Sequence, residues 1–324
     1  MNKEYKISVI IPVYQAECYI ERCVRSLFEQ TMDDIQYVFV DDCTPDKSIE
    51  IISRLLLEYA DRNDDVVIIR HLQNMGQAAA RNSGLGKACG EYIGWVDADD
   101  YVESSMFMKL YETAQINEAD IVCCDIVRER GEGMTKEEFS YEIELKDDVM
   151  KHIEGGIYSA LWNKIIRRSL YEDNHIRFAD GVNMWDDLSV TLPLRYFSKK
   201  TIVVHDALYI YNNMNESSIT MSHRSLSHQM QKLRCVEYLL DRMKNAMPSK
   251  HFLALLEFGF KTKEFLFYPP YYNLLQWRES ISESNRYVMS YAYIPFIKKI
   301  KFYFCLKFPF FLINYFLKKH YKLL

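Results

Sequence analysis

Two hydrophobic patterns alternate along the first 125 residues, and this alternation restricts the fold more than any other feature of the chain. Segments between the strands repeat apolar residues every three or four positions, as from Ile20 to Phe28, which is typical of helices. The strand-like segments are short apolar runs rich in β-branched residues: Ile7–Val13, Ile35–Val40, Val66–Ile69, Tyr92–Val96 and Ile121–Val122. Strands without a polar face indicate a parallel sheet covered by helices on both sides. We therefore predict an α/β fold with a mostly parallel sheet.

Beyond residue 130 the pattern becomes less regular, which predicts further domains or subdomains. Three later segments have the character of strands or mixed elements: Phe139–Leu145, Trp162–Leu170 and Thr201–Asn212. Leu226–Met247 and Phe252–Phe267 are predicted helices separated by a break at Pro248, because proline does not continue a helix interior. We predict a domain over residues 1–222 with a division near residue 126, a helical region over 223–285 and a C-terminal segment over 286–324.

The C-terminal segment differs from the rest of the chain in charge. It holds eight Lys or Arg residues and no Asp or Glu between Arg286 and Leu324, whereas the whole chain has a formal net charge of −5. The acidic remainder argues against nucleic-acid binding, which depends on neutralising phosphates. Lysines among Phe and Tyr side chains favour an element lying on an anionic membrane surface. The alternative is a helical appendage that packs on the catalytic domain or forms a homodimer interface.

No segment of the C-terminal region is predicted to span a membrane, and the cysteines indicate a reducing compartment. The longest apolar run without lysine, Phe308–Leu317, is far shorter than the roughly 20 residues that a spanning helix needs. The eight cysteines form no CxxC pair and no zinc-like cluster, so we expect reduced thiols in the cytoplasm. The apolar run near the N-terminus contains Pro12 and has no small-residue cleavage site, so it is predicted to be the first strand rather than a signal peptide.

Acidic residues follow two of the predicted strands. The second strand ends in Asp41 and Asp42, and the fourth is followed by Asp97, Ala98, Asp99 and Asp100. Since ligands of such sheets bind beyond the carboxyl ends of the strands, we expect these aspartates to converge there around a cation. Carboxylates in an Asp-x-Asp pattern suit Mn²⁺ or Mg²⁺ bound together with a diphosphate. The alternative is a polar turn in which Asp99 or Asp100 caps the next helix.

Two common nucleotide-binding signatures are missing, and one basic residue stands between the third and fourth strands. The absence of GxGxxG and of a GxxxxGK[ST] loop disfavours a dinucleotide-dependent dehydrogenase and a P-loop nucleotidase. Arg81 lies in the segment Asn74–Gly84, whose alanines favour a helix close to the sheet. Its guanidinium could pair with the acidic strand ends or with a phosphate. The other interpretation is a surface arginine on an ordinary helix.

In combination and order, these segments resemble the inverting family 2 glycosyltransferases with a GT-A fold, of the kind that assemble bacterial capsule, exopolysaccharide and O-antigen. The resemblance is strong over about residues 6–126 and weaker to about residue 220. It is carried by VIIPVYQAECYIERCVRSLFEQT, VFVDDCTPDKS, QNMGQAAARNSGLGKACGEYIGWVDADD, ALWNKIIRRSL and WDDLSVTLPL. It implies a UDP-sugar donor held by residues 1–126 and a glycan or lipid-linked glycan acceptor held by residues 127–222. It also implies a location on the inner face of the cell membrane.

The resemblance assigns roles to individual residues. Asp187 is implied to be the catalytic base, with Asp186 beside it as the neighbouring acid. Asp99 is implied to bind the metal, Mn²⁺ or Mg²⁺, and Asp97 to face the metal or the ribose. The other residues implied to bind the nucleotide-sugar are Pro12, Val13, Tyr14, Glu17, Asp42, Arg81 and Ala98.

The sequence also departs from the family pattern, which keeps other functions open. Gln15 stands where asparagine is common, Cys43-Thr44-Pro45 replaces a Gly-Ser turn, and Asp186 replaces a glutamate. The alternatives are therefore a catalytically inactive, membrane-associated scaffold and a sugar-1-phosphate nucleotidyltransferase. The second is disfavoured because no glycine-rich phosphate loop follows the first strand.

Three further side chains have two interpretations each. Trp185 could stack on a sugar or anchor its loop in the core. His205 could approach the metal, although a solitary histidine is more often structural, and Lys164 could contact a phosphate or simply be solvated. A single displacement needs no protein nucleophile, so we expect no Ser-His-Asp arrangement.

Overall fold

The computed structural model describes residues 4–130, 133–138, 159–214, 225–268, 270–271, 273–292 and 294–307. The chain divides into two compact units. The first, here called the catalytic unit, comprises Met1–Leu145 and Gly156–Met221, and the second, the helical unit, comprises Lys146–Gly155 and Ser222–Leu324.

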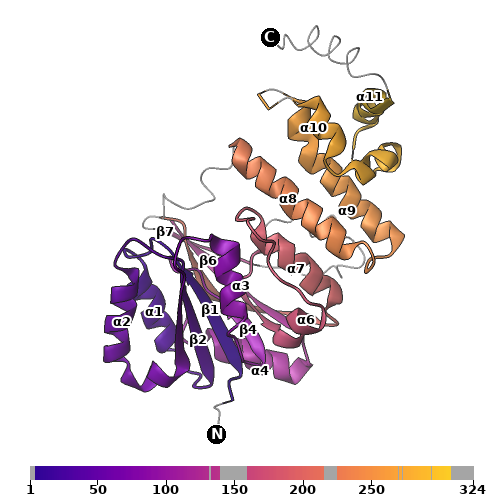
Figure 1. The fold of residues 1–324 in the computed structure, drawn as a ribbon. Coiled ribbons are helices and arrows are strands. Elements are labelled where there is room, and N and C mark those ends of the chain that lie inside the picture. The colour runs from indigo at the N-terminus through magenta and orange to yellow at the C-terminus, as the bar shows by residue number, and fades with distance from the viewer. Residues whose placement is uncertain are drawn as a thin grey trace. The chain divides into compact units, whose positions relative to one another are not determined.

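The catalytic unit is built on a sheet with the strand order β3-β2-β1-β4-β8-β6-β9-β5, with β7 paired to β6 (Figure 1). Its first four strands are parallel and form one half of the sheet. They are β1 (Ile7–Val13), β2 (Ile35–Asp41), β3 (Val66–Arg70) and β4 (Tyr92–Trp95). β1 lies between β2 and β4, and nearly every residue of these three strands is buried. Because the strands are parallel, their carboxyl ends lie along one edge of the sheet.

The other half of the sheet is mixed. Its strands are β5 (Tyr101–Val102), β6 (Ile121–Arg130), β7 (Gly133–Glu137), β8 (Lys164–Arg167) and β9 (Thr201–Asn212). β8 is antiparallel to both β4 and β6, so β6 runs in the same direction as β1 to β4. β9 is parallel to β6, and its register shifts beside Asp125. The predicted strand Phe139–Leu145 lies outside the described residues.

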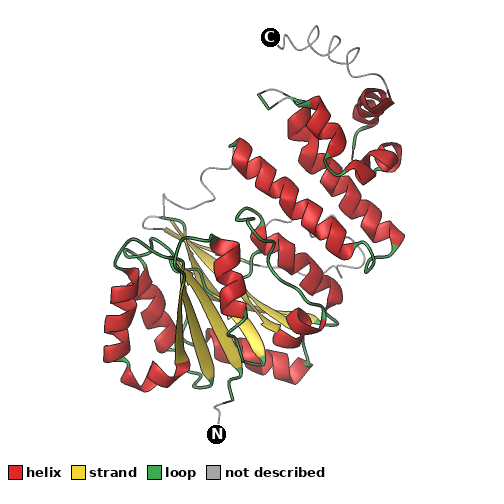
Figure 2. Ribbon diagram, viewed as in Figure 1, coloured by secondary structure: helices red, strands yellow, loops and turns green. Residues whose placement is uncertain are grey.

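Helices cover both faces of this sheet (Figure 2), as the strands without a polar face predict. One core contains apolar side chains of α1 (Ile20–Phe28), α2 (Ser48–Glu58) and α4 (Met106–Asn117). The other core contains side chains of α3 (Gln77–Leu85), α6 (Arg168–Asp173) and α7 (Asp186–Phe197). A short helix, η1 (Ala60–Asp65), precedes β3. α3 packs closely on β1, since a Cβ on Gly84 would lie 2.3 Å from Ile10 Cγ2.

The helical unit contains α8 (Leu226–Met243), α9 (Ser249–Thr262), η4 (Lys263–Phe267), α10 (Leu274–Glu279), η5 (Ser282–Ser290) and α11 (Phe296–Lys307). Pro248 directly precedes α9, at the predicted break. An aromatic cluster forms the core: Phe260, Phe267, Trp277 and Phe302 lie with ring centroids 5.0–5.7 Å apart. Among the described residues, no helix has the length and hydrophobicity needed to cross a bilayer.

Candidate active site

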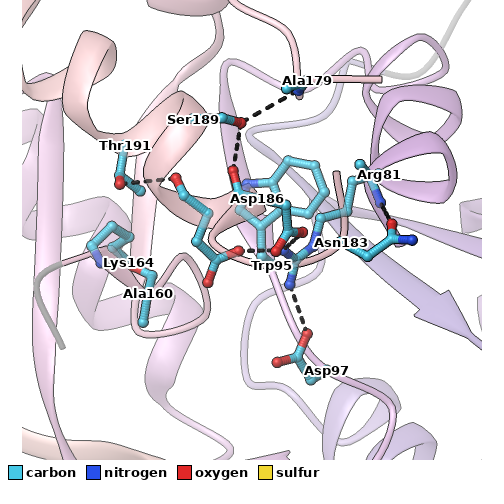
Figure 3. Close-up of polar contacts among 12 residues, drawn as sticks. Arg81, Trp95, Asp97, Ala160, Lys164, Ala179, Asn183, Asp186, Ser189 and Thr191 are labelled. Atoms are coloured by element: carbon cyan, nitrogen blue, oxygen red, sulfur yellow. Dashed lines mark hydrogen bonds and ion pairs between the residues drawn. The ribbon is translucent and has the colours of Figure 1, made fainter. Parts of the chain in front are cut away.

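Arg81, on α3, is the centre of the candidate site. Its side chain is only 2% exposed, and its Nη1 donates to Asp186 Oδ2 at 2.5 Å and to Asp187 Oδ1. Its Nη2 donates to Asp97 Oδ1 at 3.2 Å. Figure 3 shows Arg81 between Asp97 on one side and Asp186 on the other. Burial disfavours the charge of Arg81, but the three carboxylates outweigh it and raise the pKa of the guanidinium. One buried cation therefore joins carboxylates from two distant segments of the chain.

The carboxylates of Asp186 and Asp187 lie in the first turn of α7. Trp185, which precedes this helix, has a left-handed backbone with φ +64°, an uncommon conformation for a large side chain. Asp186 is buried, whereas the side chain of Asp187 is 23% exposed. Burial raises the pKa of Asp187 to about 7, and this effect is opposed by Arg81 and reinforced by Asp186. Asp187 Oδ2 accepts no hydrogen bond from a described residue, so this oxygen is available to take a proton.

The segment before α7 is attached to α3 at several points besides Arg81. Asn82 Nδ2 donates to Phe178 O, and Phe178 N donates to Asn82 Oδ1. At the start of α3, Ala78 N donates to Asn183 Oδ1 at 3.2 Å. Gly76, with φ +88°, must be glycine here because a Cβ would lie 2.5 Å from Asn183 Nδ2. These contacts fix the position of Asp186 and Asp187 relative to the helix that carries Arg81.

The acidic segment after β4 contains two partly exposed carboxylates, Asp97 and Asp99, and one buried carboxylate, Asp100. Asp100 is 1% exposed and accepts hydrogen bonds from Tyr209 Oη at 2.6 Å and Asn212 N at 2.8 Å. Burial raises the pKa of Asp100 well above its ordinary value, and Asp99 and Asp97 add to this effect. Asp97 and Asp99 are partly exposed, with buried Ala98 between them. Asp100 therefore holds the loop on β9, and Asp97 and Asp99 are the carboxylates that a ligand can reach.

The donor atoms of this segment suit a divalent cation of the Mg²⁺ or Mn²⁺ type. Three carboxylates within four residues repel each other, and Arg81 neutralises only the one at Asp97. Hard oxygen ligands, one or two of them from the protein, are what these ions use when a phosphate completes the shell. In the described part of the chain no three His, Cys, Asp or Glu side chains form a ready-made metal cage. Asp97 and Asp99 could thus supply the one or two protein carboxylates that such an ion uses.

Asp42, after β2, has a different set of partners from Asp97 and Asp99. Its Oδ1 accepts from Met75 N at 2.8 Å and its Oδ2 from Gly76 N at 2.8 Å, while His71 Nδ1 lies 2.7 Å from Oδ1. β1 separates β2 from β4, which places the ends of those strands roughly 10 Å apart. In the described residues Asp42 thus holds the loop that leads into α3, and the hydrogen-bond partners described for it differ from the Arg81 partner of Asp97.

His71 also contradicts one expectation from the sequence. Its Nε2 lies 2.8 Å from Ser83 Oγ, so Ser83, His71 and Asp42 form a Ser-His-Asp arrangement that was not predicted. The three residues are far apart in sequence and meet only because α3 packs on the carboxyl edge of the sheet. With a neutral imidazole, Nδ1–H donates to Asp42 and the Ser83 hydroxyl donates to Nε2. The arrangement joins β2, β3 and α3 and has no contact with the Arg81 cluster among the described hydrogen bonds.

The end of β1 carries the remaining residues implied to bind a nucleotide. Val13 is buried and Pro12 partly buried, whereas Tyr14 is 44% exposed beyond the strand. Glu17 Oε2 accepts from Lys47 N at 3.1 Å, which connects this turn to the start of α2. Asp41 Oδ1 accepts from Thr44 N at 2.9 Å, and thus steadies the turn after β2.

That turn shows how the departures from the family pattern are accommodated. Cys43 is exposed and has φ +56°, a left-handed conformation that glycine adopts more readily. Thr44 Oγ1 accepts from Gln15 N at 2.8 Å and donates to Asp46 Oδ1. Thr44 thereby ties the turn after β2 to the turn after β1.

Lys164 and His205 occupy positions that the sequence did not indicate. Lys164 is buried and lies beside Ala160 (Figure 3), to whose O its Nζ donates. Its Nζ also donates to Asn163 Oδ1 at 2.8 Å. Burial lowers the pKa of Lys164, and the charge of Asp187 opposes this effect. His205 is 64% exposed and lies 3.5 Å from Asp125. The buried contacts of Lys164 exclude a solvated side chain, and the contact described for His205 is with Asp125 on β6.

Residues 8–182 match the model of the glycosyl transferase family 2. The chain belongs to this family. It is 34% identical over 221 residues to the uncharacterized glycosyltransferase EpsJ of Bacillus subtilis, a match that covers 66% of this chain and 62% of EpsJ. It is also 32% identical over 212 residues to a poly(ribitol-phosphate) beta-glucosyltransferase of Bacillus spizizenii, covering 64% of this chain and 32% of that protein. The matches thus span less than two thirds of these relatives' lengths.

Solved structures of S. aureus TarS share the fold. TarS 1-349 in complex with UDP-GlcNAc has a TM-score of 0.66 and 22% identity, over 88% of this chain and 81% of that one. The complex with UDP has a TM-score of 0.61 and 20% identity, over 87% and 78% of the two chains. The predicted GT-A fold of family 2 glycosyltransferases, with a helical C-terminal region, is therefore confirmed.

Proposed function

We propose that this protein is an inverting glycosyltransferase that moves a hexose or N-acetylhexosamine from a UDP-sugar to a glycan acceptor in cell-surface polysaccharide synthesis. The observation that carries the proposal is the Arg81 cluster. It brings the Asp-x-Asp segment after β4 next to the Asp186-Asp187 pair of α7. Membership of the family and the fold shared with proteins crystallised with UDP and UDP-GlcNAc support the donor class.

On the donor side, the chain supplies the carboxyl edge of β1 and β4. Tyr14 and the partly exposed Asp97 and Asp99 are the side chains there that a nucleotide diphosphate can reach. We propose that the uracil base and the ribose of the donor bind to the segment Pro12–Glu17 and to Asp97. Asp99, with Asp97, would hold Mn²⁺ or Mg²⁺, which when bound supplies positive charge to the leaving diphosphate.

On the acceptor side, we assign the catalytic base to Asp187. Its Oδ1 is fixed by Arg81, and its Oδ2 accepts no hydrogen bond from a described residue. With a pKa of about 7, Asp187 is suited to remove the proton of an acceptor hydroxyl near neutral pH. The hydroxyl oxygen then attacks the anomeric carbon as the bond to the diphosphate breaks. One such displacement inverts the anomeric configuration and needs no protein nucleophile.

The test compares Asp187→Asn with its matched neighbour, Asp186→Asn. Because the acceptor is unidentified, turnover is measured as the slow hydrolysis of a UDP-sugar instead of as transfer. We expect Asp187→Asn to lower turnover by about 100-fold or more, while UDP and Mn²⁺ still raise the melting temperature, because binding to the native state stabilises it. Asp186→Asn should keep most of the turnover. Unchanged hydrolysis in Asp187→Asn would place the base elsewhere.

A second candidate is a catalytically inactive, membrane-associated scaffold that retains the fold. The departures from the family pattern at Cys43-Thr44-Pro45 and at Asp186 lend this alternative some weight. A screen of nucleotide-sugars with and without Mn²⁺ separates the two functions. An enzyme should be stabilised by UDP-sugars and should hydrolyse one of them slowly, whereas a scaffold should show no turnover.

As part of the leading proposal, the acceptor is lipid-linked and the protein is peripheral on the inner face of the cell membrane.

A further inference from the structure

α11 presents a continuous apolar face that the helical unit does not bury. Phe296, Ile297, Ile300, Tyr303 and Phe304 are between 40% and 82% exposed. Phe296, Ile300, Tyr303 and Phe304 follow the i, i+4, i+7, i+8 spacing of one helix face, and Ile297 extends that face by one position. This set is called the α11 apolar face below. Five large apolar side chains exposed within nine residues form a patch rather than scattered single residues.

The opposite face of α11 is fixed in the helical unit. Phe302 is fully buried among Phe260, Phe267 and Trp277. At the far end of the helix, Arg278 Nε donates to Cys305 O at 3.0 Å. The helix is thus anchored by its inner side, and this anchoring determines which side chains point outward.

Lysines flank the α11 apolar face. α11 contains Lys298, Lys299, Lys301 and Lys307 and has no Asp or Glu. On a helical wheel, Lys299 and Lys301 lie on either side of the apolar face, and Lys307 lies within it at the end of the helix. Lys298, on the other side, is paired with Glu264 at 2.7 Å. Long basic side chains beside exposed aromatic and aliphatic ones are typical of helices that lie in the interface of an anionic bilayer.

We propose that the α11 apolar face inserts into the surface of an anionic lipid bilayer, with the partly exposed Lys299 and the exposed Lys307 at the phosphate groups. Lys301 Nζ instead lies over the rings of Phe267 and Tyr268. The charge of the helix favours lipid over a second copy of this chain, because two such faces would bring like charges together. The proposal deepens the membrane location given above, but it is carried by α11 alone and does not depend on the transfer reaction.

Binding is tested with the full chain and sedimented vesicles of phosphatidylcholine, with and without phosphatidylglycerol. We expect binding to vesicles that contain phosphatidylglycerol, weakened by raised salt, because salt screens the lysine–phosphate attraction. Binding of equal strength to pure phosphatidylcholine would overturn the electrostatic part of the proposal. No binding to either vesicle would overturn it entirely.

Two pairs of double variants locate the surface. Phe296→Ser/Ile297→Ser should weaken binding by about tenfold or more, whereas Leu57→Ser/Ile116→Ser, which removes equally exposed apolar side chains of the catalytic unit, should have no effect. Lys299→Gln/Lys307→Gln should weaken binding by about 25-fold, at roughly fivefold per charge. The control Lys199→Gln/Lys250→Gln removes the same charge from other exposed positions. Equal losses in a variant and its control would refute a role specific to α11.

Two further measurements separate this proposal from its alternatives. Sedimentation velocity without lipid reports a dimer. If Phe296→Ser/Ile297→Ser dissociates a dimer and leaves vesicle binding intact, the α11 apolar face is a dimer interface and the proposal is wrong. Stabilisation by UDP-sugars should be unchanged in all four double variants. Its absence in the unmodified chain would count against the proposed function and not against lipid binding.

Discussion

Replacement of Arg81 by Met tests whether this side chain neutralises the acidic cluster. The guanidinium is 2% exposed and bonds to Asp97, Asp186 and Asp187. Methionine fills a similar volume but leaves three carboxylates without their cation. Removal of one partner from a buried ion pair typically costs about 3–5 kcal/mol, and we expect a loss of that size in the free energy of unfolding at pH 8.

The cost should depend on pH in a direction that the structure determines. Burial raises the pKa of Asp187 to about 7 even with Arg81 present, and without the guanidinium it should rise further. A group whose pKa is raised on folding favours the folded state at low pH and loses this contribution as pH increases through the folded pKa. The loss caused by Arg81→Met should therefore be smaller at pH 5.5 than at pH 8.

Urea unfolding of single and double variants measures these quantities. Asp187→Asn in the Arg81→Met background should recover part of the loss, about 1–3 kcal/mol, as expected for directly coupled residues. Arg62→Met is the matched control: Arg62 is also buried, but it donates to the carbonyl groups of Phe28 and Gln30, and its carboxylate partner, Asp33 at 3.6 Å, is 91% exposed. Its loss should not depend on pH in this range. If Arg81→Met unfolds like the unmodified protein, or if Asp187→Asn gives no recovery, the cluster is not held together by Arg81.

Three other predictions concern separate parts of the chain. Lys263 is fully buried, and burial lowers its pKa from 10.5 to about 7. The unfolded state thus binds more protons between these values, so the stability of the helical unit should rise with pH across this window, by up to about 5 kcal/mol; Lys263→Met should abolish this slope in thermal unfolding. Cys43→Gly should stabilise the protein by about 0.5–1 kcal/mol by removing a left-handed non-glycine residue, and Cys43→Ala should not. Asp99→Ala should abolish Mn²⁺-dependent UDP binding in calorimetry while the melting temperature of the free protein stays within a few degrees.

The regular elements of the catalytic unit were predictable because their signals are local. The apolar runs of β1, β2 and β4 and the helical spacing of α1 depend only on residues within each element. The position of Asp97 and Asp99 beyond a strand follows from the same pattern. The reversed direction of β8 was not predictable, because nothing in the four residues Lys164–Arg167 indicates which neighbour the strand will pair with.

The partners of the candidate site residues were not predictable for a related reason. Asp42 stays a predicted nucleotide-binding residue, but nothing in the sequence indicated that its oxygens would accept hydrogen bonds from Met75, Gly76 and His71, about 30 residues further along the chain. Asn183, which accepts a hydrogen bond from Ala78 N at the start of α3, could not be identified as a site residue from the sequence, since a single asparagine in an irregular segment has many uses. Such contacts appear only when the packing of α3 on the sheet is known.

The same packing explains why the two halves of the candidate site depend on each other. Arg81 is 16 residues from Asp97 and 106 residues from Asp187 in sequence, yet one guanidinium bonds to both. Asp97 raises the pKa of Asp187 and Arg81 opposes this effect, so a change of charge at the donor side alters the protonation of the candidate base. Any ligand that draws Asp97 away from Arg81 would leave Asp187 with a larger share of the guanidinium and a lower pKa. Occupation of the donor side would thus favour the ionised form of Asp187 that the proposed transfer requires.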